Sequence, residues 1–113
     1  MYFTYILRCE DNSLYTGITT DLDRRMEEHF SKGEKCAKYT YRHTPKKLEA
    51  AWKSETRAIA SKLEFNIKRL TKQQKEDLVA KKETIRSVLS EKVDSKLYRR
   101  VSMKNKLGEK NGK

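Results

Sequence analysis

Two runs of aromatic, aliphatic and threonine residues open the chain, at positions 2–7 and 14–19. The segment between them, residues 10–13, reads Glu-Asp-Asn-Ser and consists of turn formers. Runs of this kind on either side of a turn sequence predict a β-hairpin, so residues of the two strands are expected to lie close together. A third apolar run at 48–53 predicts another short strand, with Trp52 as the expected aromatic anchor of the sheet.

Three stretches repeat apolar residues at helical spacing. The positions expected to face the core are Leu22, Met26 and Phe30 in the first helix, Ile59, Leu63, Ile67 and Leu70 in the second, and Leu78, Val79, Ile85, Val88 and Leu89 in the third. Thr20 and Thr71 are the expected N-caps of the first and third helices, and Gly33 is expected to end the first. The second helix is expected to begin near 54–56, and the polar residues of 33–47 predict a loop.

The composition changes at residue 91, because residues 91–113 hold eight Lys and Arg against three Asp and Glu, with few apolar residues. Such a segment buries too little apolar surface to offset the entropy of ordering it. We therefore expect one folded domain over residues 1–90 and a disordered basic tail over 91–113. The tail would either bind phosphates without sequence specificity, which would steepen the salt dependence of binding, or have no role.

The chain is strongly basic, because 27 Lys and Arg against 16 Asp and Glu give its 113 residues a net charge of +11. This excess favours a polyanion as partner, nucleic acid first and an anionic membrane surface second. Hydrophobic residues make up 35% and charged residues 38%, so the core must be small. Cys9 and Cys36 lack the spacing of a zinc site or a disulfide framework. No membrane span and no secretion signal are predicted, and we expect a cytoplasmic location.

A small set of residues has the chemistry that phosphodiester hydrolysis requires: an activated water, positive charge on the phosphate oxygens and assistance to the leaving oxygen. Tyr5 and Tyr15 lie on the predicted neighbouring strands, and Arg25 and His29 are four apart, on one helix face. Glu64 flanks the apolar stripe of the second helix. Tyrosine can relay a proton, arginine matches phosphate geometry, and one carboxylate can hold Mg²⁺ that also takes water and substrate oxygens.

Each of these residues also has an ordinary structural interpretation. The two tyrosines could be core residues whose hydroxyls contact water. Glu64 could form an i,i+4 surface ion pair with Lys68. Arg25 could belong to the solvated face of its helix, and a lone histidine such as His29 is more often structural than catalytic. The joint order and spacing of the set favour a functional site.

That order resembles the GIY-YIG nuclease domain. The strings that carry the resemblance are Thr-Tyr-Ile-Leu at 4–7, Leu-Tyr-Thr-Gly-Ile-Thr at 14–19, Asp-Leu-Asp-Arg-Arg at 21–25 and the segment 58–70 around Glu64. Ala-Lys-Tyr-Thr at 37–40 and Ile-Lys-Arg-Leu at 67–70 are typical of the small stand-alone bacterial members. The resemblance covers roughly residues 2–80.

The resemblance implies an α+β fold, with a three-stranded antiparallel sheet flanked by about three helices, and divalent-metal-dependent cleavage of DNA. Tyr5 and Tyr15 match the tyrosines of the two motifs, one of which is expected to help deprotonate the attacking water. His29 matches a histidine that is a second candidate for proton transfer. Gly17 matches the glycine that allows close approach of the backbone beside the site.

Two further matches concern the phosphate and the metal. Arg25 matches the arginine that binds and polarises the phosphate, and Glu64 matches the single carboxylate that holds Mg²⁺ or Mn²⁺. The basic residues expected to contact nucleic acid are Arg24, Lys38, Arg42, Lys68 and Arg69.

The chain departs from the family pattern in three places. Phe-Thr replaces Gly-Ile before the first tyrosine, and Ile18 stands where excision-repair relatives have a lysine. The asparagine that many active members carry after the glutamate is missing, with Gln73 or Gln74 as the nearest substitute. No DNA-targeting domain is recognisable, so substrate choice would rest on the domain, the loop and the tail.

The sequence therefore predicts an endonuclease that acts on DNA in repair, recombination or the processing of branched or damaged structures. One alternative is a nucleic-acid-binding module with weak or no cleavage. Another is a nuclease subunit that takes its specificity from a partner protein. RNA as substrate and the oligomeric state stay open.

Overall fold

The structure is a computed structural model that describes residues 1–31 and 42–102. Its centre is an antiparallel sheet with the strand order β2-β1-β3-β4. The strands are β1 (Tyr2–Cys9), β2 (Leu14–Thr19), β3 (Pro45–Ser54) and β4 (Arg99–Arg100). The α+β class and the hairpin of β1 and β2 are confirmed, whereas the expected three strands are four, because β4 adds to the outer edge of β3.

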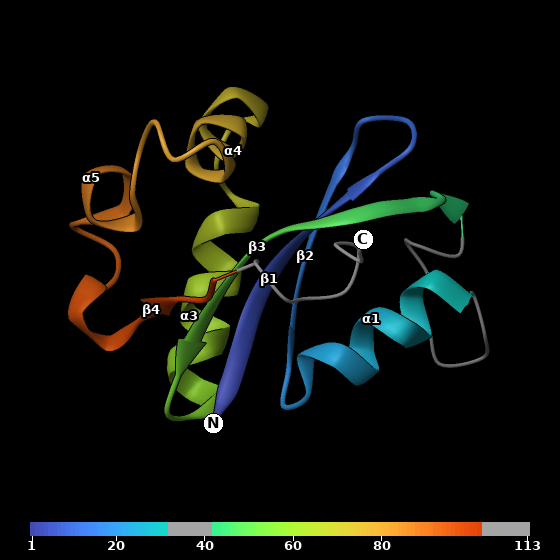
Figure 1. Ribbon diagram of the computed structural model, residues 1–113. Helices are drawn as coiled ribbons and strands as arrows, with labels where there is room; N and C mark the ends of the chain where they lie inside the picture. Colours follow the sequence, from blue (N-terminus) through green and yellow to red (C-terminus); the bar gives the residue numbers. More distant parts are fainter. Residues whose placement is uncertain (32–41, 103–113) are drawn as a thin grey trace.

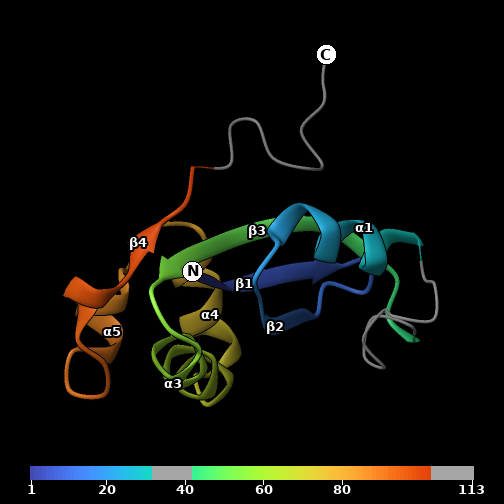
Figure 2. The ribbon, with the colours of Figure 1, turned by 90° about the horizontal axis from the view of Figure 1, so that it is seen from below.

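Helices cover both faces of the sheet (Figures 1 and 2). They are α1 (Leu22–Ser31), α3 (Arg57–Lys68), α4 (Lys72–Val79) and α5 (Ile85–Leu89), followed by a 3₁₀ turn, η1 (Ser95–Leu97). Helix α1 lies on one face, and α3, α4 and α5 lie on the other. Among the helices of the described residues, none has the length and apolarity that crossing a membrane would demand.

Two apolar clusters form on the two faces because successive strand residues point to opposite sides. Ile6 of β1 and Trp52 of β3 pack with residues of α3, α4 and α5. Tyr5 and Leu7, the neighbours of Ile6, pack instead with Met26 of α1. Trp52 is 3% exposed, in agreement with its expected role as the aromatic anchor. The side chain of Tyr5 therefore belongs to the face that α1 covers.

Helix boundaries differ from expectation at two places. Asp21, and not Thr20, caps α1, because its carboxylate accepts a backbone N–H of the first turn. The expected third helix is two helices, separated where Lys81 has a φ of 66°, a left-handed conformation that ends a helix. Thr71 caps α4 as expected, and Thr84 caps α5 with a capping box of its own.

The inward face of α1 and the start of β3 also differ from the predicted pattern. Phe30, expected in the core, is 37% exposed, and His29 is buried instead. Strand β3 begins at Pro45, so the last residues of the predicted loop belong to the sheet. The expected helix stop at Gly33 and the loop residues 33–41 lie outside the described residues.

Residues 91–102 pack against the domain, and the expectation that this part of the tail is disordered is wrong. Val93 is buried, and the Tyr98 hydroxyl donates to a backbone carbonyl of α3 at 2.7 Å. Arg100 donates to two carbonyls at the end of α4, at 3.0 and 3.1 Å. A few apolar side chains suffice to order this segment, because they pack against a core that the rest of the domain already forms. The remainder of the expected tail, 103–113, lies outside the described residues.

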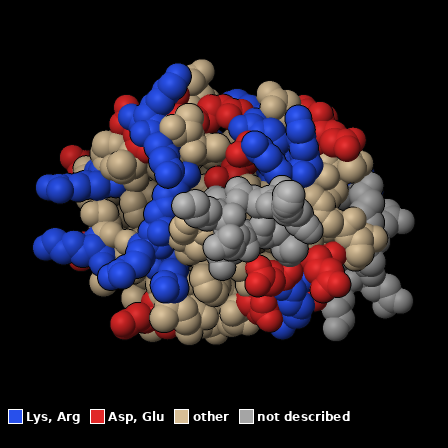
Figure 3. All heavy atoms as spheres, in the orientation of Figure 1, with Lys and Arg blue, Asp and Glu red and all other residues tan. Residues whose placement is uncertain are grey.

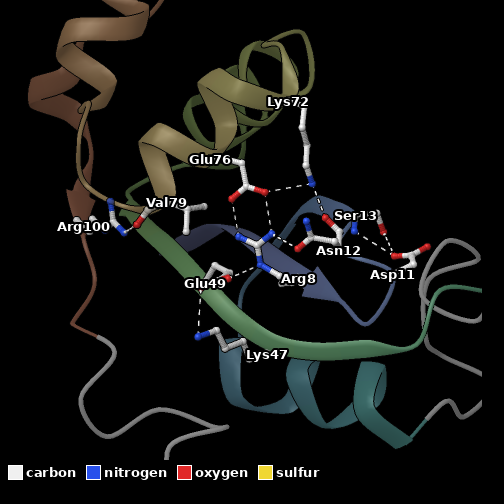
Figure 4. Close-up of polar contacts among 10 residues, drawn as sticks. All are labelled: Arg8, Asp11, Asn12, Ser13, Lys47, Glu49, Lys72, Glu76, Val79 and Arg100. Atoms are coloured by element: carbon white, nitrogen blue, oxygen red, sulfur yellow. Dashed lines mark hydrogen bonds and ion pairs between the residues drawn. The ribbon is translucent and has the colours of Figure 1, made fainter.

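Arg8 of β1 ties β3 and α4 to the hairpin (Figure 4). Its guanidinium donates to both carboxylate oxygens of Glu76 at 2.7 and 2.6 Å, and its Nε donates to Glu49 at 2.5 Å. A further bond reaches the side chain of Asn12 in the turn at 2.8 Å, and Lys72 pairs with Glu76 at 3.2 Å. Hydrogen bonding from Arg8 lowers the pKa of Glu76 to about 2. The network fixes α4 against the end of the hairpin.

Candidate active site

The hairpin register brings Tyr5, Tyr15 and Gly17 together. Tyr5 pairs across the strands with Gly17, and Leu7 pairs with Tyr15. Because alternate strand positions share a face, all four lie on the side of the sheet that α1 covers. The Tyr5 and Tyr15 rings lie 6.2 Å apart between centroids, at 50° to each other. Tyr5 is 1% exposed, and Tyr15 is half-buried.

Close packing explains the glycine at position 17. A Cβ atom there would lie 2.7 Å from the Tyr5 hydroxyl oxygen, 2.9 Å from its Cζ and 3.1 Å from Cε2 of Tyr15. Contacts this short would force the phenol of Tyr5 to move. Gly17 therefore lets the Tyr5 hydroxyl lie directly against the backbone of the edge strand β2.

Helix α1 adds His29 and Arg25 to the tyrosines. The His29 ring, which is fully buried, packs edge-on against both phenols, with centroid distances of 5.7 Å to Tyr5 and 5.5 Å to Tyr15. Its Nε2 lies 2.7 Å from the Tyr5 hydroxyl oxygen. Arg25, one turn earlier, lies close enough to lower the pKa of Tyr5, and it pairs with Glu28, with Nη1 and Oε1 2.7 Å apart. Four residues predicted as site candidates thus converge at one point.

The hydrogen bonds around Tyr5 can be assigned a direction. A guanidinium only donates, so the favourable interaction of Arg25 with Tyr5 is with the phenol oxygen. The direction of the bond between Tyr5 and His29 depends on the imidazole tautomer; we assign the Tyr5 O–H as donor and Nε2 as acceptor, which places the imidazole proton on Nδ1. The result is a short path for a proton from the phenol to the imidazole.

Burial keeps both partners of this pair neutral. It raises the pKa of Tyr5 well above its ordinary value, with a further increase from the neighbouring Tyr15, and the hydrogen bond from Arg25 opposes this only in part. Burial, followed by the positive charge of Arg25, lowers the pKa of His29 to about 4, against a smaller opposing effect of the Glu28 carboxylate. At neutral pH the site therefore holds an intact phenol beside an imidazole that can accept a proton.

Glu64 lies on α3 close enough for its charge to act on Tyr5. After burial and Tyr15, the Glu64 carboxylate is a further cause of the raised pKa of Tyr5. Its side chain is 23% exposed, and it forms the i,i+4 ion pair with Lys68, at 3.2 Å, that was the structural alternative to a metal-holding role. Within residues 1–31 and 42–102, no group of three or more His, Cys, Asp or Glu is arranged to hold a metal. Glu64 is thus a single, partly accessible carboxylate and not part of a preformed cage.

The basic residues expected to contact nucleic acid differ in their surroundings. Arg24 and Lys68 have side chains that are 55% and 53% exposed, and Arg42 and Arg69 are exposed as well. Lys38 lies outside the described residues. In Figure 3, Lys and Arg side chains form a band that runs from top to bottom of one face, with smaller acidic groups around it. Exposed positive charge is therefore available for phosphate contacts.

Sequence reasoning did not identify the carboxylate that pairs with Arg25, and the two glutamines that it suggested in place of the missing asparagine make other contacts. Glu28 pairs with Arg25, and its i,i+3 spacing was the available signal. Gln74 takes part in the capping box of α4, and Gln73 donates to a carboxylate one turn further along that helix. These local contacts occupy both glutamine side chains, so neither replaces the missing amide in the site.

Comparison with known proteins identifies relatives over most of the chain. A family model described as the GIY-YIG catalytic domain matches residues 1–77. A UPF0213 protein of Fusobacterium nucleatum is 45% identical over 80 residues, which are 71% of this chain and 78% of that protein. The UPF0213 protein YhbQ of Salmonella typhimurium is 41% identical over 90 residues, 79% of this chain and 87% of that protein. A solution NMR structure of a UPF0213 protein from Bacillus halodurans is 43% identical, with a TM-score of 0.47, over 73% of this chain and 86% of that one.

Proposed function

Because the chain belongs to the GIY-YIG catalytic domain family, a family of nucleases, we propose that it is a metal-dependent endonuclease that hydrolyses phosphodiester bonds of DNA. The observation that carries the proposal is the convergence of Tyr5, Tyr15, Arg25 and His29 over Gly17, with the charge of Glu64 acting on the same phenol. These groups are the proton-transfer, phosphate-binding and metal-holding elements that the reaction requires.

In this proposal Tyr5 and His29 work as one proton-transfer unit. The raised pKa of Tyr5 means that the phenol alone is a poor base. His29 is neutral at pH 7 and lies 2.7 Å from the phenol oxygen, so it is placed to take the Tyr5 proton as the phenol oxygen takes one from the attacking water. Its pKa of about 4 makes it a weak base, so its contribution comes from its position. Tyr15 packs against both rings and holds them in place, and it is the second candidate for contact with the water.

Arg25 binds the scissile phosphate. Its guanidinium already contacts Tyr5 and Glu28, so it is aimed into the site. A phosphate would compete with Glu28 for the same N–H donors and accept a bidentate pair from them. Glu28 therefore orients the Arg25 side chain before the substrate arrives. Because the two residues lie i,i+3 on one helix, Arg25 can exchange Glu28 for the phosphate by side-chain rotation, without a movement of the backbone.

Glu64 is the residue that would hold Mg²⁺ or Mn²⁺. A single hard carboxylate donor suits Mg²⁺, which is usually bound through one or two carboxylates together with waters and substrate phosphates. The ion would place positive charge against the phosphate and stabilise the leaving oxygen. Lys68, paired with Glu64 at 3.2 Å, keeps the carboxylate in position until then. The Glu64 donor thus fits an ion whose remaining ligands come from substrate and solvent.

The net charge of +11 supports a nucleic-acid substrate, and we propose DNA in repair, recombination or the processing of branched or damaged structures. RNA is the alternative polyanion. A partner protein that directs the domain to its substrate is a further part of the proposal.

The test is a cleavage assay on labelled linear, single-stranded, flapped and four-way DNA and on structured RNA, with Mg²⁺ or Mn²⁺. Glu64→Gln should lower the cleavage rate roughly 100-fold or more while leaving DNA affinity intact, because it removes one electrostatic element of the transition state. The matched control is Glu55→Gln, which changes an exposed glutamate outside the site. Tight binding without cleavage under every metal would reject the nuclease and favour the binding module.

A further inference from the structure

Phe65 is exposed in the last turn of α3, three residues before the helix ends. Its side chain is 59% exposed, and the helix end is closed by the Arg69 N–H, which donates to the carbonyls of Asn66 and Ile67. The other exposed large hydrophobic residues of the described part of the chain are Met1, Phe30 and Leu97. Met1 is at the chain end, Phe30 is next to the last residue of α1, and Leu97 ends a 3₁₀ turn. Because the end of α3 is closed by these hydrogen bonds, fraying does not account for the exposure of Phe65. Single exposed hydrophobic residues are common on protein surfaces, so the neighbours of Phe65 decide whether it can bind a ligand.

Arg69 covers part of the Phe65 ring. The centre of its guanidinium lies 5.4 Å from the ring centroid, one helical turn along the exposed side of α3. This cation–π contact holds a flat aromatic ring and a flat cationic group side by side. An aromatic ring next to an arginine is the combination on which single-stranded nucleic acids stack their bases.

The pair adjoins the proposed metal-holding residue. Phe65 follows Glu64 directly, and Lys68, which pairs with Glu64 at 3.2 Å, lies three residues beyond Phe65 on the same helix surface. From Glu64 to Arg69 the helix rises by about 7.5 Å, at about 1.5 Å per residue. A strand whose phosphate is at Glu64 can therefore reach Phe65 with a base close to that phosphate.

We propose that Phe65 and Arg69 form a stacking platform for an unpaired base of the substrate, next to the phosphate that is cut. The proposal rests on the nuclease function proposed above and adds a substrate class: nucleic acid with unpaired nucleotides beside the scissile bond. In a duplex both faces of each base are covered by its neighbours, so a flat side chain on a helix surface cannot stack on them. Lys68 would contact the phosphate between the cut site and the stacked base.

The test measures binding without cleavage. The full-length protein is titrated in EDTA against a single-stranded oligonucleotide that carries one 2-aminopurine, and against the same sequence as a blunt duplex. Stacking should quench the 2-aminopurine emission, and the single strand should bind more tightly than the duplex. Phe65→Ala should abolish the quenching and weaken single-strand binding about tenfold, equivalent to about 1.4 kcal/mol, with duplex affinity unchanged.

Matched variants separate stacking from folding and from charge. Phe65→Tyr keeps an aromatic ring and should restore both affinity and quenching. Arg69→Lys keeps the charge but loses the planar group, so it should weaken the single strand more than the duplex. Leu97→Ala removes another exposed hydrophobic side chain, and its binding should match that of the unsubstituted protein. All four changes are at exposed positions, so the variants should fold.

Three results would overturn the platform. The first is that Phe65→Ala binds the single strand and quenches 2-aminopurine as strongly as the unsubstituted protein. The second is that Phe65→Ala loses affinity for the single strand and for the duplex to the same extent. The third is self-association of the protein that Phe65→Ala abolishes, because the ring would then belong to an interface between copies of the chain. The nuclease proposal fails separately. If the protein shows quenching that depends on Phe65 but never cleaves nucleic acid, the nuclease proposal is rejected and the platform is kept. If the protein cleaves nucleic acid but Phe65→Ala binds and quenches like the unsubstituted protein, the platform is rejected and the nuclease is kept.

Discussion

His29 makes the stability of the domain depend on pH. Its imidazole is fully buried between two tyrosine rings, and it accepts a hydrogen bond from Tyr5 in its neutral form. Burial, with the charge of Arg25, lowers its pKa from 6.5 to about 4. The unfolded chain therefore binds a proton below pH 6.5 that the folded chain refuses until about pH 4. Stability should be constant above this window and fall as the pH falls through it.

The size of the effect follows from the two pKa values. Linkage predicts a loss of about 2 kcal/mol between pH 7 and pH 5, and about 3 kcal/mol over the whole window. The Arg8-bound Glu76 contributes at lower pH, because its pKa falls from 4.5 to about 2 and its stabilisation is lost only as the pH drops below about 4.5. The interval from pH 7 to pH 5 thus isolates the histidine from the Arg8 network.

Urea unfolding at pH 7, 6 and 5 measures this loss. Trp52, the only tryptophan of the chain and 3% exposed, provides the fluorescence signal. His29→Gln keeps a side chain that can hydrogen-bond to Tyr5 but cannot titrate, and it should remove most of the pH dependence. His43→Gln, at a surface position paired with Asp11, should retain it. A loss below about 0.5 kcal/mol in the unsubstituted protein, or an undiminished loss in His29→Gln, would refute the reasoning.

Three further predictions follow from packing. Gly17→Ala places a Cβ 2.7 Å from the Tyr5 hydroxyl oxygen and should destabilise the fold by about 1–3 kcal/mol in urea; an unchanged midpoint would contradict the close contact. Arg8→Met leaves two partly buried carboxylates, Glu49 and Glu76, with only their lysine partners, and should destabilise the fold by about 2–3 kcal/mol in the same assay; a negligible change would show that the network contributes no more than surface ion pairs. Truncation after residue 90 removes β4 and should lower the melting temperature measured by circular dichroism, whereas truncation after Ser102 should not.

Local patterns in the sequence determined most of the elements. The hairpin follows from two β-favouring runs around a turn, and α3 follows from Leu63 and Ile67 at helical spacing behind the Thr56 cap. These signals lie within a few residues of one another, so neither needs the rest of the fold. The set of site candidates was also within reach, because the order of the two tyrosine motifs and the glutamate can be compared with a family.

Only the tertiary structure decided how the site residues meet and where the folded chain continues. The Tyr5–His29 bond joins residues that are 24 positions apart, and the burial of His29 in place of Phe30 depends on the rotation of α1 against the sheet. Strand β4 forms because Arg100 and Tyr98 find acceptors on α4 and α3. Such contacts join residues far apart in the chain and leave no periodic pattern, since their energy comes from surfaces that exist only once the sheet and helices have assembled.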